Sequence, residues 1–200
     1  MTFIMILPQT FYEQDTTTVA KKLLGCYLVH PEGEETTLGR IVETEAYLAY
    51  DPAAHSFMGK TKRNAVLFGP VGHAYVYFIY GMHYCVNVVT GREGAGEAVL
   101  IRALEPQRGI ALMQQRRRTE KVTLLCNGPA RLTEALGITV AFNGSSFFNG
   151  SLQIWSAESF PSPPMIGTAD IVQTTRIGIT KAKELPLRFY LKENRYISRR

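Results

Sequence analysis

Two carboxylates and a phenol occupy alternate positions in the run Ile41-Val42-Glu43-Thr44-Glu45-Ala46-Tyr47. Side chains alternate between the two faces of a β-strand, so Glu43, Glu45 and Tyr47 are expected to share one face. A carboxylate beside an aromatic ring could act as a general acid or base on a bound substrate. The alternative is a solvated outer face, which is the commoner fate of paired glutamates on a strand.

A histidine follows this strand after a short loop. His55, in the run Asp51-Pro52-Ala53-Ala54-His55-Ser56, can bring an imidazole back to the end of the strand. A carboxylate, an aromatic face and an imidazole could then line one pocket. Taken alone, a loop histidine is more often a surface or capping residue, and its spacing matches no metalloprotease helix.

Two further polar residues lie within otherwise apolar strand candidates. Asn87 and Arg102 would each need a partner if they are buried. For Arg102, an ion pair with Glu43 or Glu105 that only satisfies the sheet is as compatible with the spacing as a role on a substrate.

Residues 75–84 carry far more aromatic side chains than a turn normally holds. Gly81 marks the expected bend of a hairpin, which would put Tyr80 and Met82 at an exposed tip. Large apolar groups gain nothing from contact with water, so either a partner covers them or they fold back onto the core. A basic protein with such a wedge is similar to proteins that insert side chains into the DNA minor groove, and Tyr77 below the tip could stack on a base.

The charge balance is basic, with 22 lysines and arginines against 17 acidic residues and a net charge of +5. This excess attracts polyanions such as DNA, although a solvated cationic surface is an equally good interpretation. Arg131 is the best candidate for binding a phosphate. It lies next to Gly128-Pro129 at the start of a predicted helix, whose free N–H groups and dipole add to its charge.

The composition of the chain fits one globular domain spanning residues 1–200. With 46% hydrophobic and 20% charged residues, it excludes a disordered chain, a coiled coil and a membrane bundle. Three widely spaced cysteines form neither a disulfide framework nor a metal clip, so free thiols in a reducing cytosol are expected. The apolar opening stretch stops at Pro8 and lacks basic residues, so we expect no secretion signal and a cytoplasmic protein without a membrane span.

The periodicity and the turn residues predict the α+β class: a mixed, mostly antiparallel and curved β-sheet with flanking helices and a protruding β-hairpin. Helices are predicted at 15–24, 106–118 and 129–136, and surface loops at 142–150 and 159–164. Strands are predicted at 26–30, 37–47, 66–68, 73–79, 84–89, 98–104, 152–155 and 187–191.

Several of these runs together resemble the alkyladenine (3-methyladenine) DNA glycosylase family. They are residues 39–47, 53–56, 75–77, 79–82, 102–106, 128–129, 176–178 and 186–190, which cover nearly the whole chain in the order of the family. The resemblance implies a monofunctional enzyme that flips alkylated or deaminated purines out of duplex DNA and hydrolyses the N-glycosidic bond, the first step of base excision repair. The implied bases are of the 3-methyladenine, 7-methylguanine, hypoxanthine and ethenoadenine class.

The resemblance also implies a role for each matching residue. Glu45 would be the general base that activates a water, Glu43 would support it, and Arg102 would lie near that water and the backbone phosphate. The extruded base would be held between Tyr47 on one side and His55 and Tyr77 on the other, and Asn87 would exclude guanine. The residues implied to contact DNA are Tyr80, which fills the vacated space in the duplex, Met82 and His83 beside it at the tip, and Arg131 and Arg176 on the backbone.

Simple hydrolysis is expected, because the matching pocket motifs contain no lysine that could form a Schiff base. The expected product is an abasic site without strand cleavage. No metal and no organic cofactor is implied. We expect a monomer whose partner is double-stranded DNA that contains damaged purines.

Two other functions remain open from the residues alone. The first is a metal-dependent hydrolase that uses Glu43, Glu45, His55, His73 and His83 as ligands, although their spacing gives it little support. The second is a noncatalytic binder of bent or damaged DNA, for which the aromatic tip and the basic surface suffice.

Overall fold

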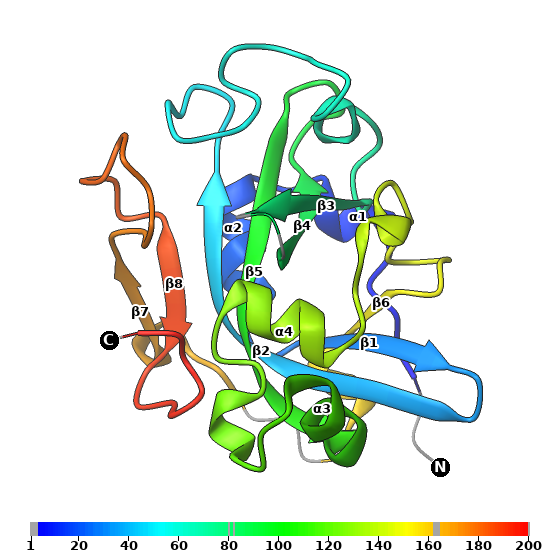
Figure 1. Cartoon of the computed structure of the whole chain (residues 1–200). Helices are drawn as coiled ribbons and strands as arrows, with labels where there is room; N and C mark the ends of the chain where they lie inside the picture. Colours follow the sequence, from blue (N-terminus) through cyan, green and yellow to red (C-terminus); the bar gives the residue numbers. More distant parts are fainter. Residues whose placement is uncertain (1–3, 80, 82, 162–164, 200) are drawn as a thin grey trace.

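The computed structural model describes residues 4–79, 81, 83–161 and 165–199. Within these ranges an open, antiparallel sheet of eight strands is flanked by four α-helices (Figure 1). The main strand order is β3-β4-β5-β2-β1-β6, with β8 added beside β2 and β7 beside β8. The predicted α+β class is therefore confirmed.

The long strand β2 (Glu35–Tyr47) organises the sheet. Its first half forms a hairpin with β1 (Tyr27–Glu32), closed at Gly33, whose φ of +61° lies in the left-handed region that glycine adopts without strain. Its second half pairs with β5 (Glu97–Arg108) on one edge and with β8 (Arg188–Leu191) on the other. The segment that carries Glu43 and Glu45 therefore lies between two neighbouring strands.

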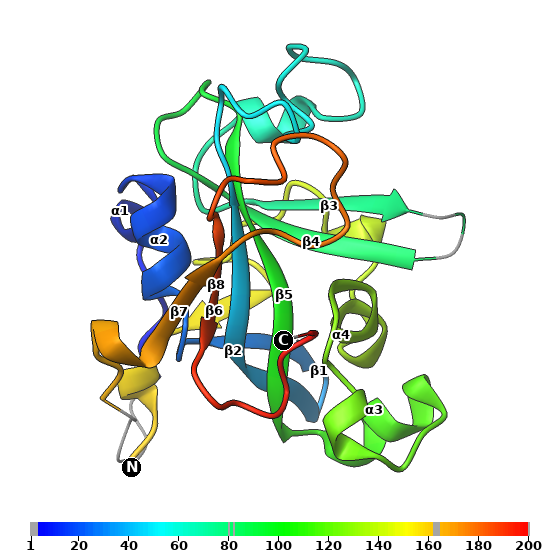
Figure 2. The same cartoon turned by 90° about the vertical axis from the view of Figure 1, so that its left-hand side faces the viewer.

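Strands β3 (Ala74–Ile79) and β4 (His83–Thr90) form the predicted hairpin. Only the last part of β4, residues 87–90, pairs with β5. In Figure 2 the hairpin runs across the direction of β2 and β5 and extends beyond the body of the molecule. Its tip contains Tyr80 and Met82, which lie outside the described residues, so their predicted roles stay predictions.

Helices cover both faces of the central strands (Figure 2). Helix α2 (Thr16–Lys22) packs on β2 and β5, and the carboxylate of Asp15 caps its first turn by accepting the Thr18 N–H at 2.9 Å. Helix α4 (Pro129–Ala135) packs on β4 and β5 from the other side and begins with a proline, which suits the first turn. The main apolar core fills the space between these layers.

Shorter elements complete the fold. They are α1 (Gln9–Tyr12), α3 (Ile110–Arg117), β6 (Gln153–Trp155) and β7 (Ile171–Thr174), with 3-10 turns η1 (Ala65–Phe68), η2 (Val122–Leu124), η3 (Val140–Phe142), η4 (Ala157–Ser159) and η5 (Thr168–Asp170). No helix in the described ranges combines the length and the hydropathy that crossing a bilayer requires.

Two sequence predictions about these elements are wrong, and a third holds only in part. Residues 66–68 form the turn η1 rather than a strand, because this short apolar run is closed by a hydrogen bond from Gly69 N–H to the Val66 carbonyl. The stretch from Pro106 continues strand β5, and helix α3 starts only after Gly109, where φ is +74°. Residues 142–150 are not simply a surface loop, since Phe147 is fully buried in the core.

Candidate active site

A cavity of about 610 Å³ opens where strands β2 to β5 meet two loops, residues 52–58 and 177–181. Its volume lies in the range of pockets that hold small organic ligands. Most of its lining is apolar or aromatic, with a few polar groups directed inward, including Asn87 and Arg102. Four of the predicted site residues from the strands and His55 from the first loop line this one pocket.

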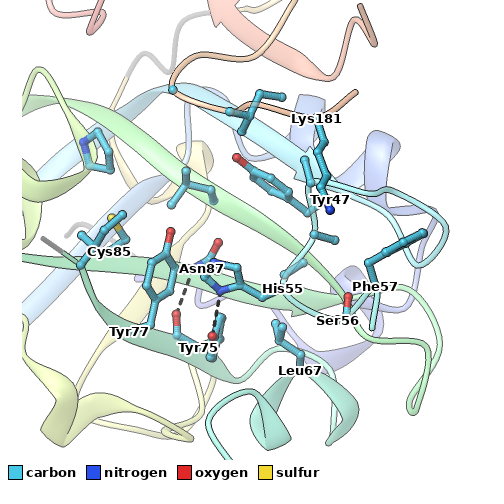
Figure 3. A pocket seen from close by; sticks show the side chains of 18 of the residues that line it. Tyr47, His55, Ser56, Phe57, Leu67, Tyr75, Tyr77, Cys85, Asn87 and Lys181 are labelled. Atoms are coloured by element: carbon cyan, nitrogen blue, oxygen red, sulfur yellow. Dashed lines mark hydrogen bonds between the residues drawn. The ribbon is translucent and has the colours of Figure 1, made fainter. Parts of the chain in front are cut away.

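Aromatic rings form opposite walls of the pocket. Figure 3 shows Tyr47 on one side of the hollow and His55 and Tyr77 on the other. The rings of His55 and Tyr77 meet edge to face with centroids 4.6 Å apart. His55 Nδ1 and the hydroxyl of Tyr75 are 3.0 Å apart, within hydrogen-bond distance, so the imidazole is held against the wall. The arrangement leaves a slot between flat side chains.

The loop that carries His55 is held by Asn64, which the sequence analysis did not identify. Its buried amide group donates to the carbonyls of His55 at 2.8 Å and Gly59 at 3.0 Å, and its oxygen accepts the Thr61 N–H at 2.6 Å. An asparagine can replace missing backbone partners in this way because it both donates and accepts. The buried Asn64 therefore fixes one wall of the pocket.

Glu45 lies directly behind the wall formed by Tyr47 and Arg102 and is fully buried. Its Oε2 accepts from the Tyr47 hydroxyl at 2.9 Å, and its Oε1 accepts the Ile177 N–H at 2.9 Å. Arg102 Nη1 lies 3.1 Å from the same Oε1. All three partners are donors, as the oxygens of an ionised carboxylate require.

Glu43 shares that face of β2 and is also fully buried, so the interpretation of a solvated strand face is wrong. Its Oε1 accepts from Arg102 Nε at 3.2 Å and from Arg188 Nε at 2.6 Å. The guanidinium of Arg102 thus joins the two carboxylates, whereas Glu105 pairs with Arg40 instead. Of the two predicted partners of Arg102, Glu43 is confirmed and Glu105 is not.

The pKa values of the pocket residues follow from burial and from neighbouring charges. Burial, and then the charge of Glu45, raises the pKa of Tyr47, so the hydroxyl keeps its proton and donates a hydrogen bond to that carboxylate. Burial lowers the pKa of His55 from 6.5, helped by Arg63, which favours a neutral ring at neutral pH. Burial opposes the charge of Arg102, but Glu45 and Glu43 outweigh it and raise the pKa of the guanidinium.

Asn87 projects from β4 into the same pocket, and its amide group donates to the Tyr75 carbonyl at 3.1 Å. The pocket wall also contains Cys85 and Lys181, which the sequence analysis did not place there (Figure 3). Lys181 comes from a loop more than a hundred residues after β2. No local sequence pattern in that loop indicates that its lysine lines a pocket.

The residues predicted to contact DNA are placed differently. Arg131 is exposed at the start of α4, beside Pro129 and Ala130 of the pocket, and its Nη1 donates to Asn127 at 2.7 Å. His83 is half-buried at the start of β4.

Arg176 is a correction to the predicted DNA contacts. Its side chain is fully buried, forms a two-point ion pair with Asp51, and lies 4.7 Å from the ring centre of Tyr47. A guanidinium enclosed in this way faces no solvent, so it supports the pocket from behind instead of touching the DNA backbone.

The five residues of the metal-dependent alternative do not form a common cluster. In the part of the chain that the structure describes, no group of three or more His, Cys, Asp or Glu side chains is arranged to hold a metal ion. Glu43 and Glu45 bind guanidinium groups, while the ring of His73 packs on Phe148 near a different part of the sheet.

Comparisons with known proteins show what the chain as a whole is similar to. Residues 10–195 match the sequence profile of the family described as methylpurine-DNA glycosylase. A protein of Methanoculleus marisnigri named "Putative 3-methyladenine DNA glycosylase" is 65% identical over 98% of this chain and 100% of its own length. Proteins with the same name are 52% identical in Carboxydothermus hydrogenoformans, over 98% of this chain and 100% of theirs, and 50% identical in Francisella tularensis, over 92% and 94%.

Proposed function

The chain belongs to the methylpurine-DNA glycosylase family, and from this premise we propose that it extrudes damaged purines from duplex DNA into the pocket and releases them there. Membership makes it a DNA glycosylase, a DNA repair enzyme that hydrolyses N-glycosyl bonds. The observation that carries the finer proposal is a slot between aromatic rings with a buried carboxylate directly behind its wall.

Extrusion is required because a base in a duplex is inaccessible to a buried carboxylate. Its cost is a few kcal/mol and is smaller for a damaged or mismatched base, which is one source of selectivity. Side chains of the β3–β4 hairpin, including Tyr77 and Cys85, line the pocket, so the hairpin would lie beside the extruded base. We assign Tyr80 to filling the space that the base leaves, on the strength of its position in the sequence.

The aromatic walls suit a range of altered purines. Stacking contributes about 1 to 3 kcal/mol per base and depends little on base identity, so Tyr47, Tyr77 and His55 can accept several lesions. The proposed substrates are 3-methyladenine, 7-methylguanine, hypoxanthine and ethenoadenine. Asn87 works against unmodified guanine, because its fixed amide group crowds the 2-amino group of that base. 7-Methylguanine carries the same amino group, but its positive charge makes it a better leaving group, so we propose that it is released despite the crowding.

Glu45 is the proposed general base. A water gives up a proton to its carboxylate, the water oxygen forms a bond to the anomeric carbon, and the N-glycosidic bond breaks as its electron pair leaves with the purine. The Tyr47 hydroxyl donates a hydrogen bond to Oε2 of Glu45, so it would have to move before a water could reach that oxygen. A base that enters the slot and shifts the Tyr47 ring would open that oxygen to water. Arg102 would balance the charge of the carboxylate.

The product is an abasic site. Lys181 lines the pocket and carries an amine of the kind that forms Schiff bases. We propose simple hydrolysis with Glu45 as the base, and strand breaks without alkali would instead identify Lys181 as the candidate nucleophile. We further propose that the enzyme acts as a cytoplasmic monomer on duplex DNA.

The test uses duplexes that each hold one altered purine, incubated with the enzyme and then treated with or without alkali. Strand breaks that need alkali are expected with wild-type enzyme, and breaks without alkali would contradict simple hydrolysis. The E45Q variant should bind damaged duplex and release no base. Unchanged release by E45Q would exclude Glu45 as the base, and wild-type binding without release would favour the noncatalytic binder.

A further inference from the structure

After strand β8 the chain turns back toward strands β2 and β5 (Figure 2), where Ser198 comes within hydrogen-bond distance of Glu43. Tyr196 and Ile197 are buried and anchor the segment in the main core. The next residue, Ser198, reaches the fully buried carboxylate of Glu43, which lies 155 positions earlier in the chain. A stretch distant in sequence therefore contacts the residue pair that the proposed chemistry depends on.

Ser198 binds Glu43 at both oxygens. Its N–H donates to Oε2 at 2.6 Å and its hydroxyl donates to Oε1 at 2.8 Å. The other donors to Oε1 are the Nε atoms of Arg102 and Arg188. Arg188 also donates through Nη2 to the carbonyl of Arg199, which ties the same segment to the cluster a second time.

The guanidinium of Arg102 transmits this contact to Glu45. Its Nε faces Glu43 at 3.2 Å, its Nη1 faces Glu45 at 3.1 Å, and its Nη2 lies 3.4 Å from the Ser198 hydroxyl oxygen. A guanidinium is planar and rigid, so a shift on the side of Glu43 and Ser198 turns the Nη1 that meets Glu45. Two carboxylates and two guanidiniums balance in charge, and their arrangement depends on the neutral donors around them.

We propose that Ser198 is a positioning residue: through Glu43 it holds the guanidinium of Arg102 in the orientation that keeps Glu45 ready to accept a proton. This inference rests on the proposed function of Glu45. Ser198 itself does not line the pocket, and it meets the pocket residue Arg102 only through Nη2.

The experiment measures excision under single-turnover conditions at saturating enzyme, with full-length protein and a hypoxanthine-containing duplex. S198A removes the hydroxyl and keeps the N–H bond to Glu43, S198T restores a hydroxyl, and S151A is the control at an exposed serine. Binding is measured separately by anisotropy on the same duplex with a 2′-fluoro sugar, which resists hydrolysis. Thermal denaturation shows whether each variant folds.

S198A should excise about ten- to a hundredfold more slowly, the scale of a small displacement in a catalytic array, while its affinity for the fluorinated duplex stays within about twofold. S198T should recover most of the rate, and S151A should match wild-type. Wild-type rates for S198A would overturn the proposal. So would a parallel loss of rate, affinity and thermal stability that S198T does not restore, which indicates a structural role. An inactive wild-type enzyme on all four lesions would instead refute the proposed function.

Discussion

Replacing Asp51 with asparagine would leave the buried guanidinium of Arg176 without its counter-charge. Both side chains are fully enclosed, and two of the guanidinium nitrogens face the two carboxylate oxygens. The substitution keeps an oxygen that can still accept the Ala53 N–H, now at 2.9 Å, so the loop is not deprived of its backbone contact. The change is therefore confined to the ion pair.

The expected loss of stability is large. Removing one partner of a buried ion pair costs about 3 to 5 kcal/mol, because the remaining charge stays out of water without compensation. Arg176 Nη1 still donates to the Ala46 carbonyl at 3.1 Å and the guanidinium still lies over Tyr47, which recover part of that cost. We expect D51N near the lower end, about 3 kcal/mol. For a chain of this size that lowers Tm by roughly 10 °C.

A double-mutant cycle separates the pair from each residue's other contacts. D51N, R176M and D51N/R176M are compared with wild-type in urea denaturation, with Cm and the m-value fitted for each. The double variant removes both charges, so it should cost about as much as one single variant. Single losses below about 1 kcal/mol, or a double loss equal to their sum, would refute the account of a buried ion pair.

The same variants decide whether Arg176 contacts DNA. A residue that contacts a phosphate changes the dependence of binding on salt, by about one unit in the slope of log affinity against log salt. R176M should keep the wild-type slope. If the folded R176M protein shows a less steep dependence of log affinity on log salt, the DNA contact predicted from the sequence is correct and the conclusion drawn from the burial of Arg176 is wrong.

Three further predictions concern residues of the pocket and its rim. The pKa of His55 is lowered from 6.5, so at pH values between that lower pKa and 6.5 the unfolded chain binds more protons than the folded chain. The free energy of unfolding should therefore decrease as the pH falls below about 6.5. In urea denaturation at a series of pH values, H55Q should show a weaker dependence of this free energy on pH. R131Q should make the salt slope of DNA binding less negative by about one, since Arg131 is exposed, and an unchanged slope would exclude a phosphate contact. N87S should release guanine from undamaged duplex, and release as low as wild-type would show that the Asn87 amide does not exclude it.

Local patterns predicted the strand that carries the carboxylates. Alternation along residues 41–47 correctly placed Glu43, Glu45 and Tyr47 on one face, because the period of a strand is a local property. The same pattern could not tell a buried face from a solvated one. Burial here depends on Arg102 and Arg188, which come from two other strands, and no local signal reports them.

Errors arose where a local signal competes with distant pairing. Pro106 is typical of a helix start, yet it lies in β5 opposite Gly39, at a point where the register of the strand pair shifts. The family resemblance of residues 176–178 predicts a DNA-backbone contact for Arg176, whereas in the fold its partner is Asp51, 125 positions away. Asn64 and Ser198 were missed for the same reason, since each acts through hydrogen bonds that only the folded chain creates.

The carboxylates lie on a strand with hydrogen-bonded neighbours on both edges, while much of the opposite side of the cavity is formed by loops. Amide protons at positions 43–45 should exchange with solvent only when the whole molecule unfolds, whereas those of residues 52–58 should exchange through small local openings. Mutations in those loops can consequently alter which lesion is accepted without weakening the scaffold.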